Sequence, residues 1–110
     1  MGQMYWEDMQ KSGRWDIAYI CDTDPASREL ARNLSPSSRI ISDEQEIFDD
    51  RSVEAVGLFA LANSRKEQIE KAVRSHKHIL TEKPIADTID KAWEIVDLIA
   101  KYDRIAAVNL

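Results

Sequence analysis

Apolar runs of strand length alternate with amphipathic stretches of helical length along the 110 residues. This alternation is typical of an α/β fold, in which helices connect parallel strands. Residues 15–22 and 53–61 form the two longest apolar runs, and they predict strands that are buried on both faces. Shorter strands are predicted at 39–41 and 78–80, and a last strand at 104–110. The fold class expected from this pattern is therefore α/β with a parallel sheet.

The first two predicted helices are bounded by residues that suit helix ends. Residues 3–12 form an amphipathic stretch, and Gly13 is placed to end it. Asp24 can cap the next helix because its side chain accepts hydrogen bonds from first-turn amides, and Pro25 suits the first helical position. The apolar residues expected to face inward on this second helix are Leu30, Ala31 and Leu34.

Three further helices are predicted in the second half of the pattern. Ser42 with Gln45, and Ser64 with Glu67, have the spacing of a capping box, which favours helix starts at both places. The helix after Ser64 carries apolar residues on one face, namely Ile69, Ala72 and Val73. The last helix, 89–102, has the i, i+3, i+4, i+7 spacing of one inward stripe. The members of this stripe are Ile89, Ala92, Trp93, Val96, Ile99 and Ala100.

Composition and charge narrow the class of protein. A content of 44% hydrophobic and 32% charged residues is ordinary for a globular chain, and 110 residues suit a single domain at 1–110. The net charge of -5, with basic residues scattered among acidic ones, disfavours nucleic acid and anionic membranes as partners. No apolar run approaches the roughly 20 residues that span a bilayer, and the polar start does not resemble a signal peptide. We therefore expect a cytoplasmic protein.

The cysteine and the histidines do not predict a reactive or metal-binding centre. Cys21 is the single cysteine, which agrees with a reducing compartment. It lies inside an apolar run and is better interpreted as a small core residue than as a nucleophile. His76 and His78 alternate as two ligands on one strand face could, but no third histidine or further cysteine accompanies them. We therefore predict no metal site.

Glu82, Lys83 and Pro84 interrupt the pattern where the apolar run 78–80 ends. Pro84 has no N–H and disfavours helical geometry in the residue before it, so the run must end close to this point. In an arbitrary protein, such a tripeptide is most often a charged turn at the surface. Lys83 could instead supply a cation that polarises a carbonyl or lowers the pKa of a hydroxyl. The three residues by themselves leave both interpretations open.

The element order and three motifs resemble the nucleotide-binding domain of the Gfo/Idh/MocA oxidoreductases. The motifs are ICDTDP at 20–25, KHILTEKP at 77–84 and the closing VNL at 108–110. The resemblance covers nearly the whole chain and implies a Rossmann-type parallel sheet with flanking helices. It also implies that NAD, or with less support NADP, is the cofactor. In the intact enzyme, hydride would pass between the nicotinamide and a sugar, polyol or related hydroxyl compound.

The resemblance implies site roles for five residues. Asp22 matches the carboxylate that binds the adenosine ribose hydroxyls, although Asp is also common in turns that follow strands. Lys83 matches the lysine beside the nicotinamide and the reacting hydroxyl, with Glu82 as its orienting neighbour and Pro84 fixing the backbone. Gly2 could be one glycine of the phosphate-binding turn. NAD is the expected cofactor because the carboxylate of Asp22 would repel the 2′-phosphate of NADP.

The sequence departs from the family pattern in two places. The first strand and its G-x-G-x-x-G turn are absent, so we expect an incomplete sheet and a chain truncated at both ends, without the substrate domain. Ala60 and Leu61 stand where the family has Thr-Pro, and Arg65 stands where it has a His, which leaves the cofactor contacts of this loop open. An alternative function is therefore a non-catalytic α/β association module that has lost cofactor binding.

The missing first strand has a consequence for assembly. In the order 3-2-1-4-5-6 this strand is central, so the strands around Ile17 and Val56 would lose their shared partner. We expect one of three outcomes: self-association through exposed edges, direct pairing of those two strands in a rearranged sheet, or a molten state. A homo-oligomer is the expected assembly.

Overall fold

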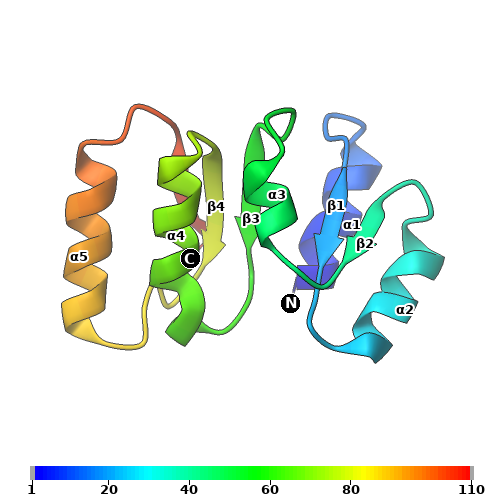
Figure 1. The fold of residues 1–110 in the computed structure, drawn as a ribbon, viewed down its shortest axis with the longest axis horizontal. Coiled ribbons are helices and arrows are strands. Elements are labelled where there is room, and N and C mark those ends of the chain that lie inside the picture. Colours follow the sequence, from blue (N-terminus) through cyan, green and yellow to red (C-terminus); the bar gives the residue numbers. More distant parts are fainter. Residues whose placement is uncertain (1, 110) are drawn as a thin grey trace. The chain divides into compact units, whose positions relative to one another are not determined.

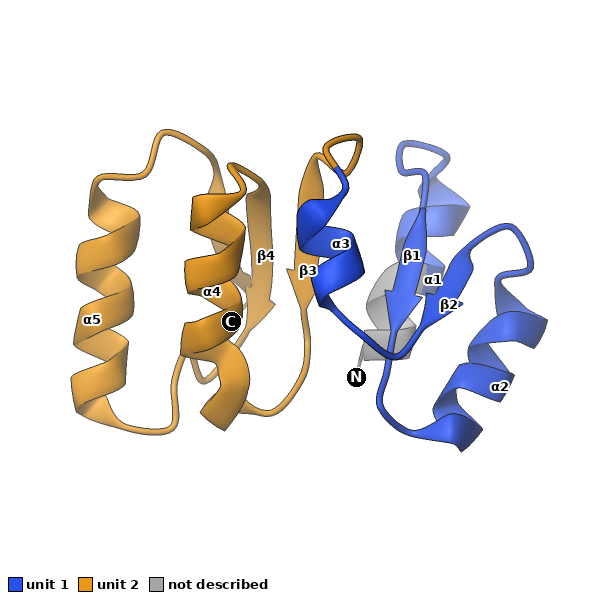
Figure 2. Ribbon diagram, in the orientation of Figure 1, with its two compact units in different colours: residues 1–50 blue, residues 51–110 orange. Residues whose placement is uncertain are grey.

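The computed structural model describes residues 2–109, with side chains from Glu7 onward, as two compact units (Figure 2). Unit 1 is Met1–Asp50 and unit 2 is Arg51–Leu110. Both contain parallel strands connected by helices, which confirms the predicted α/β class (Figure 1). The described strands form two separate sheets, so direct pairing of the strands around Ile17 and Val56, one of the three expected outcomes, is not observed, and the other two outcomes stay predictions. The assignment of 1–110 to a single domain stays a prediction.

Unit 1 contains a β-α-β segment with one helix before it and one after it. β1 and β2 are parallel, and their register runs from Tyr19 opposite Arg39 to Cys21 opposite Ile41. β1 is shorter than the predicted 15–22 because its partner strand offers only three residues for pairing, and its side chains are half-buried. The elements are α1 (Gly2–Ser12), β1 (Tyr19–Cys21), α2 (Pro25–Leu34), β2 (Arg39–Ile41) and α3 (Gln45–Asp49).

The start of α2 confirms the predicted cap. The Oδ2 atom of Asp24 accepts hydrogen bonds from the backbone amide of Ser27 at 3.2 Å and from its hydroxyl at 2.9 Å. The predicted inward face was only partly right, since Ala31 is buried while Leu30 and Leu34 are exposed. A sheet of two three-residue strands offers α2 little surface on which to bury larger side chains.

Neither predicted capping box forms. The N-cap residue of α3 makes no side-chain cap bond, and the amide of Gln45 donates to Oδ1 of Asp43 at 3.0 Å instead of pairing with Ser42. At the start of α4, the hydroxyl of Ser64 donates backward to the carbonyl of Leu61 at 3.0 Å. In both places, a local turn takes the hydrogen bonds that the capping box would have made.

Unit 2 is a three-stranded parallel sheet in the order β3-β4-β5. The middle strand extends beyond the predicted 78–80, because Thr81 pairs with Leu58 and Val108, and Glu82 pairs with Asn109. The elements are β3 (Ala55–Leu58), the 3-10 helix η1 (Ala62–Ser64), α4 (Arg65–Arg74), β4 (His78–Glu82), α5 (Ile89–Ala100) and β5 (Ala106–Asn109).

The core of unit 2 lies between the sheet and its helices, with α4 and α5 side by side (Figure 1). Ile69 and Ala72 of α4 are fully buried, as predicted. The predicted inward stripe of α5 was largely wrong: Ile95, which lies outside it, is 0% exposed, whereas Trp93 is 64% exposed. Apolar residues occur on neighbouring faces of this helix, so that its packing against α4 decides which face is buried.

Candidate functional site

The segment Glu82–Pro84 lies at the carboxyl end of β4, the edge at which open parallel sheets bind ligands. The hydroxyl of Thr81 donates to the carbonyl of Leu58 at 3.0 Å, which fixes this end of β4 against β3. The Lys83–Pro84 peptide bond is cis. The Lys83 side chain is exposed and makes no hydrogen bond or ion pair with residues 7–109. Lys83 is therefore accessible to a ligand at this edge.

Glu82 connects this turn to the neighbouring strand. Its side chain is buried, with 6% of the residue exposed. Oε1 accepts a hydrogen bond from the backbone amide of Lys83 at 3.1 Å, and Oε2 accepts one from Nδ2 of Asn109 at 3.3 Å. The carboxylate thus contacts the main chain of Lys83 and the end of β5. The orienting role predicted for Glu82 has a geometric basis, although the bond goes to the backbone amide.

Arg65, the first residue of α4, approaches the same turn from the other side. Only 2% of the residue is exposed. Its Nη1 donates to the carbonyls of Glu82 and Pro84, each at 2.5 Å, and its Nη2 donates to the carbonyl of Ala60. Burial lowers the pKa of Arg65 from its usual value, and the charge of Glu82 opposes this shift. A guanidinium with so high a reference pKa remains charged at neutral pH.

The sequence leaves the function of Arg65 open, because the pattern that points to it is weak. Its partners Glu82 and Pro84 lie 17 and 19 residues further along the chain, so no local pattern connects them. The available clue was its position in the family pattern, at the place of a His in a loop expected to lie near the cofactor. The structure therefore adds Arg65 to the candidate site.

Asp22 follows β1 in unit 1 and is exposed. Its Oδ1 accepts a hydrogen bond from the amide of Asp24 at 2.9 Å, and its backbone carbonyl accepts one from Nη1 of Arg28 at 2.9 Å. This local turn is the structural role considered from the sequence. The Oδ2 atom has no hydrogen-bond partner among residues 7–109, so the same carboxylate keeps an oxygen that can accept from a ribose hydroxyl.

The predicted site residues therefore fall into two groups. Glu82, Lys83 and Pro84 are adjacent in unit 2, and Arg65 joins them there. Gly2 begins α1 and Asp22 follows β1, both in unit 1. The cofactor roles assigned to all five remain predictions.

Cys21 and His78 lie in surroundings that suit structural roles. Burial raises the pKa of the Cys21 thiol, with Glu44 and Asp22 adding to the effect, which disfavours the nucleophilic thiolate. Nδ1 of His78 accepts a hydrogen bond from the amide of Ile105 at 3.0 Å. In the described part of the chain, no group of three or more His, Cys, Asp or Glu side chains could hold a metal ion.

No helix within residues 2–109 combines the length and apolar character needed to cross a bilayer.

Comparison with protein families and curated relatives gives one family model and a distant homologue. The model, described as an oxidoreductase family with an NAD-binding Rossmann fold, matches residues 1–110. Inositol 2-dehydrogenase/D-chiro-inositol 3-dehydrogenase of Lacticaseibacillus casei is 28% identical over 83 residues, covering 74% of this chain and 24% of the relative. The chain thus spans about a quarter of the length of this relative.

Solved structures agree on the fold. A crystal structure of an oxidoreductase from Agrobacterium radiobacter in complex with NAD+, L-tartaric acid and magnesium matches with a TM-score of 0.77 and 25% identity, over 84% of this chain and 27% of that chain. A protein from Erwinia carotovora atroseptica SCRI1043 matches over 98% of this chain and 33% of its own, with a TM-score of 0.85 and 19% identity. The second likeness concerns the fold alone.

Proposed function

The chain belongs to the Gfo/Idh/MocA oxidoreductase family, and we propose that it presents a nicotinamide dinucleotide to a small hydroxyl compound for hydride transfer. The observation that carries this proposal is Lys83, an exposed lysine on a turn that Arg65 and Glu82 hold at the carboxyl edge of the sheet. A sugar or polyol is the proposed substrate class, supported by the inositol dehydrogenase among the relatives. The whole enzyme would be a cytoplasmic homo-oligomer.

Each unit, taken separately, holds a residue whose chemistry suits one part of NAD. The free Oδ2 of Asp22 can accept hydrogen bonds from the adenosine ribose, and Lys83 can lie beside the nicotinamide and the substrate. The 110 residues contain no G-x-G-x-x-G turn for the pyrophosphate, although Gly2 at the start of α1 is a candidate contact. When bound, the cofactor supplies the hydride acceptor or donor.

The residues of this chain would act through charge and position. The ammonium of Lys83 stabilises negative charge that develops on the substrate oxygen, which favours loss of a hydroxyl proton in one direction and polarises a carbonyl in the other. Glu82 and Arg65 hold the main chain of Lys83 in place. Pro84 restricts the backbone that follows.

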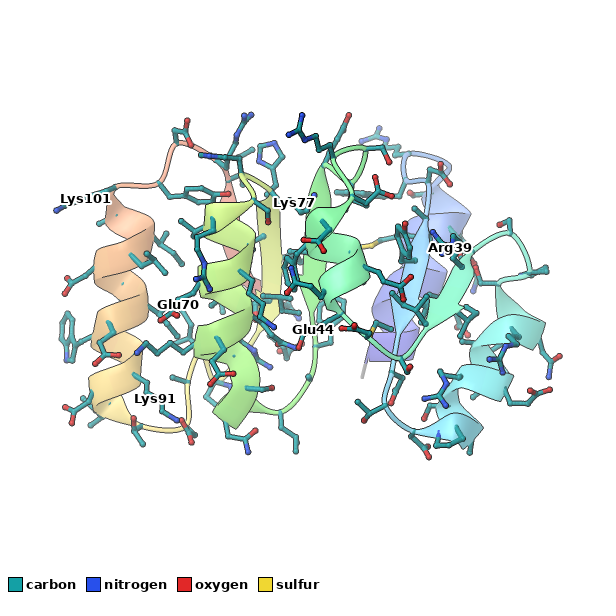
Figure 3. All side chains as sticks on the ribbon, viewed as in Figure 1. Arg39, Glu44, Glu70, Lys77, Lys91 and Lys101 are labelled. Atoms are coloured by element: carbon teal, nitrogen blue, oxygen red, sulfur yellow. The ribbon has the colours of Figure 1, made fainter. Side chains whose placement is uncertain are left out.

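Replacement of Lys83 tests this proposal in the intact oxidoreductase that contains the chain. Lys83→Met keeps much of the stem volume and removes the charge. We expect turnover to fall by roughly 100-fold or more, the scale of a lost acid-base or electrostatic group. The melting temperature should change little because the Lys83 side chain is exposed and has no partner in the described structure. Lys101→Met, at an exposed lysine of the same unit (Figure 3), is the matched control and should leave turnover unchanged.

The second candidate function is a non-catalytic association module. The departures from the family pattern at Ala60, Leu61 and Arg65, in the loop expected near the cofactor, favour it. Near-normal turnover of Lys83→Met would show that the Glu82–Pro84 segment is a surface turn without a catalytic role. That result would favour the association module. Failure to detect any hydride transfer with NAD and a range of polyols would have the same consequence.

A further inference from the structure

The buried guanidinium of Arg65 contacts the main chain on both sides of Lys83. Nη1 donates to the carbonyls of Glu82 and Pro84, the residues before and after the lysine. Nη2 donates to the carbonyl of Ala60, in the loop that follows β3. One planar group therefore joins the loops after two adjacent parallel strands. Because a guanidinium presents its donors in a rigid fork, the three contacts also fix the relative orientation of these carbonyls.

Burial of the Arg65 guanidinium is unfavourable in free energy if its only role is packing. Its Nε is buried without a hydrogen-bond partner, and desolvation lowers the pKa of the side chain. Burying a charge costs free energy that an apolar side chain of similar size would avoid. The contribution that an apolar side chain could not make is the set of charge-assisted hydrogen bonds to the three carbonyls. The geometry thus indicates that Arg65 contributes the three hydrogen bonds to these carbonyls, and not only packing.

We propose that Arg65 is the positioning residue of the Lys83 turn. It holds the carbonyls that flank Lys83, and so sets the direction in which the lysine leaves the edge of the sheet. A His, the usual residue of the family pattern here, has only two ring nitrogens and could not contact three carbonyls at once. The catalytic role of the Lys83 ammonium rests on the proposed function. The positioning of the turn by the Arg65 hydrogen bonds does not depend on that function.

Backbone hydrogen exchange of the 110-residue chain tests the proposal without any activity measurement. Two variants are compared with the wild type: Arg65→Met, which removes all donors, and Arg65→Lys, which keeps the charge on a single nitrogen. We expect exchange across residues 82–86 to accelerate about tenfold or more in Arg65→Met, with an intermediate increase in Arg65→Lys. Exchange in α2, which belongs to unit 1, should be unchanged.

A spectroscopic measurement reports on the lysine itself. Reductive methylation with 13C-formaldehyde gives Lys83 a dimethylamine signal, which Lys83→Arg identifies by its loss. In Arg65→Met we expect this signal to move toward the random-coil position and to narrow, because the turn no longer holds the lysine in one orientation. Arg74→Met, at an exposed arginine of the same helix, is the matched control and should leave both the signal and the exchange rates at wild-type values.

Two results would overturn the proposal. One is unchanged exchange at 82–86 together with an unchanged Lys83 signal in both Arg65 variants. The other is a loss of protection throughout unit 2 in both variants, which would show that Arg65 supports the whole unit instead of the turn. The activity of Lys83→Met is a separate result. Normal turnover of this variant would contradict the proposed function, but it would not contradict the proposal that Arg65 positions the turn.

Discussion

The hydroxyl of Tyr102 lies 2.6 Å from the carbonyl oxygen of Lys77 and donates a hydrogen bond to it. The same hydroxyl lies 3.2 Å from the carbonyl of Ala72, so the residues after α5 are tied to the turn between α4 and β4. Lys77, which Figure 3 labels, is itself buried, and its Nζ donates to the carbonyl of Val53 at 2.8 Å. Tyr102 therefore closes a hydrogen-bonded corner of unit 2.

Removal of the Tyr102 hydroxyl should weaken unit 2. Tyr102→Phe keeps the ring and removes the hydroxyl that donates to the carbonyl of Lys77, so the free energy of unfolding should fall by about 1–2 kcal/mol in urea titrations. Tyr19→Phe is the control, since Tyr19 donates to Asp50 near the surface of unit 1. We expect a change of roughly 0.5 kcal/mol or less there. Equal losses in the two variants would contradict a special role for Tyr102.

Tyr102 should also make stability fall at alkaline pH. Burial is the main cause that raises the pKa of Tyr102 above its usual 10, and Asp103 adds to it. A group whose pKa is higher in the folded state contributes its full stability below the unfolded pKa and loses it as the pH rises through the folded pKa. Urea midpoints should therefore hold up to about pH 10 and drop as the pH rises above it, and the drop should be smaller in Tyr102→Phe. An identical drop in both proteins would assign the effect to other groups.

The α5 helix shows how far the sequence predicts the fold. Its existence and approximate bounds followed from apolar spacing, but its buried face did not. Ile95 and Trp93 lie on different faces and both are apolar, so periodicity alone could not choose between them. The α4 helix made that choice by packing against Ile95's side of α5, where Lys66 and Glu94 also form an ion pair. Element types follow from local patterns, whereas the buried face depends on tertiary contacts.

The candidate site divides in the same way. Glu82, Lys83 and Pro84 could be found from the sequence because they are contiguous and match a family motif. Arg65 could not be assigned a function, because its partners come together only when β3 and β4 pair. Its neighbour Ser64 even suggested a capping role that does not form. Contacts between distant segments of the chain thus account for the missing part of the site.

Self-association is expected for the 110-residue chain in isolation. β3 and β5 are the outer strands of the described three-stranded sheet, and unpaired outer strands can pair with other chains. Sedimentation velocity should show oligomers that increase with concentration. Val108→Lys places a charge on exposed β5 and should shift the distribution toward monomer, whereas Lys101→Met should not. A sharp monomer at all concentrations would contradict the prediction.

Asp22 should set the cofactor preference of the intact oxidoreductase. Its carboxylate can accept hydrogen bonds from the ribose of NAD, and the nearby carboxylate of Asp24, whose pKa is lowered by hydrogen bonds from Ser27, adds negative charge. Two like unit charges about 4 Å apart repel by roughly 4 kcal/mol at a surface-type dielectric before screening, which disfavours a 2′-phosphate. Asp22→Ser should therefore lower the ratio of kcat/KM for NAD to kcat/KM for NADP. An unchanged ratio would show that Asp22 does not contact the ribose of the cofactor.

The 110-residue chain by itself should bind the cofactor only weakly. Asp22 has a carboxylate oxygen that can accept from a ribose hydroxyl, but the sequence has no G-x-G-x-x-G turn whose amides would hold the pyrophosphate. Because these amides and the helix dipole supply much of the attraction for phosphate, we expect a Kd in the millimolar range or no detectable binding. Quenching of tryptophan fluorescence by NADH, with a tryptophan-containing peptide to correct for light absorption, measures this directly. If binding is detectable, Asp22→Ser should weaken it. Saturation at low micromolar NADH would contradict the prediction and would show that other residues of the chain hold the pyrophosphate.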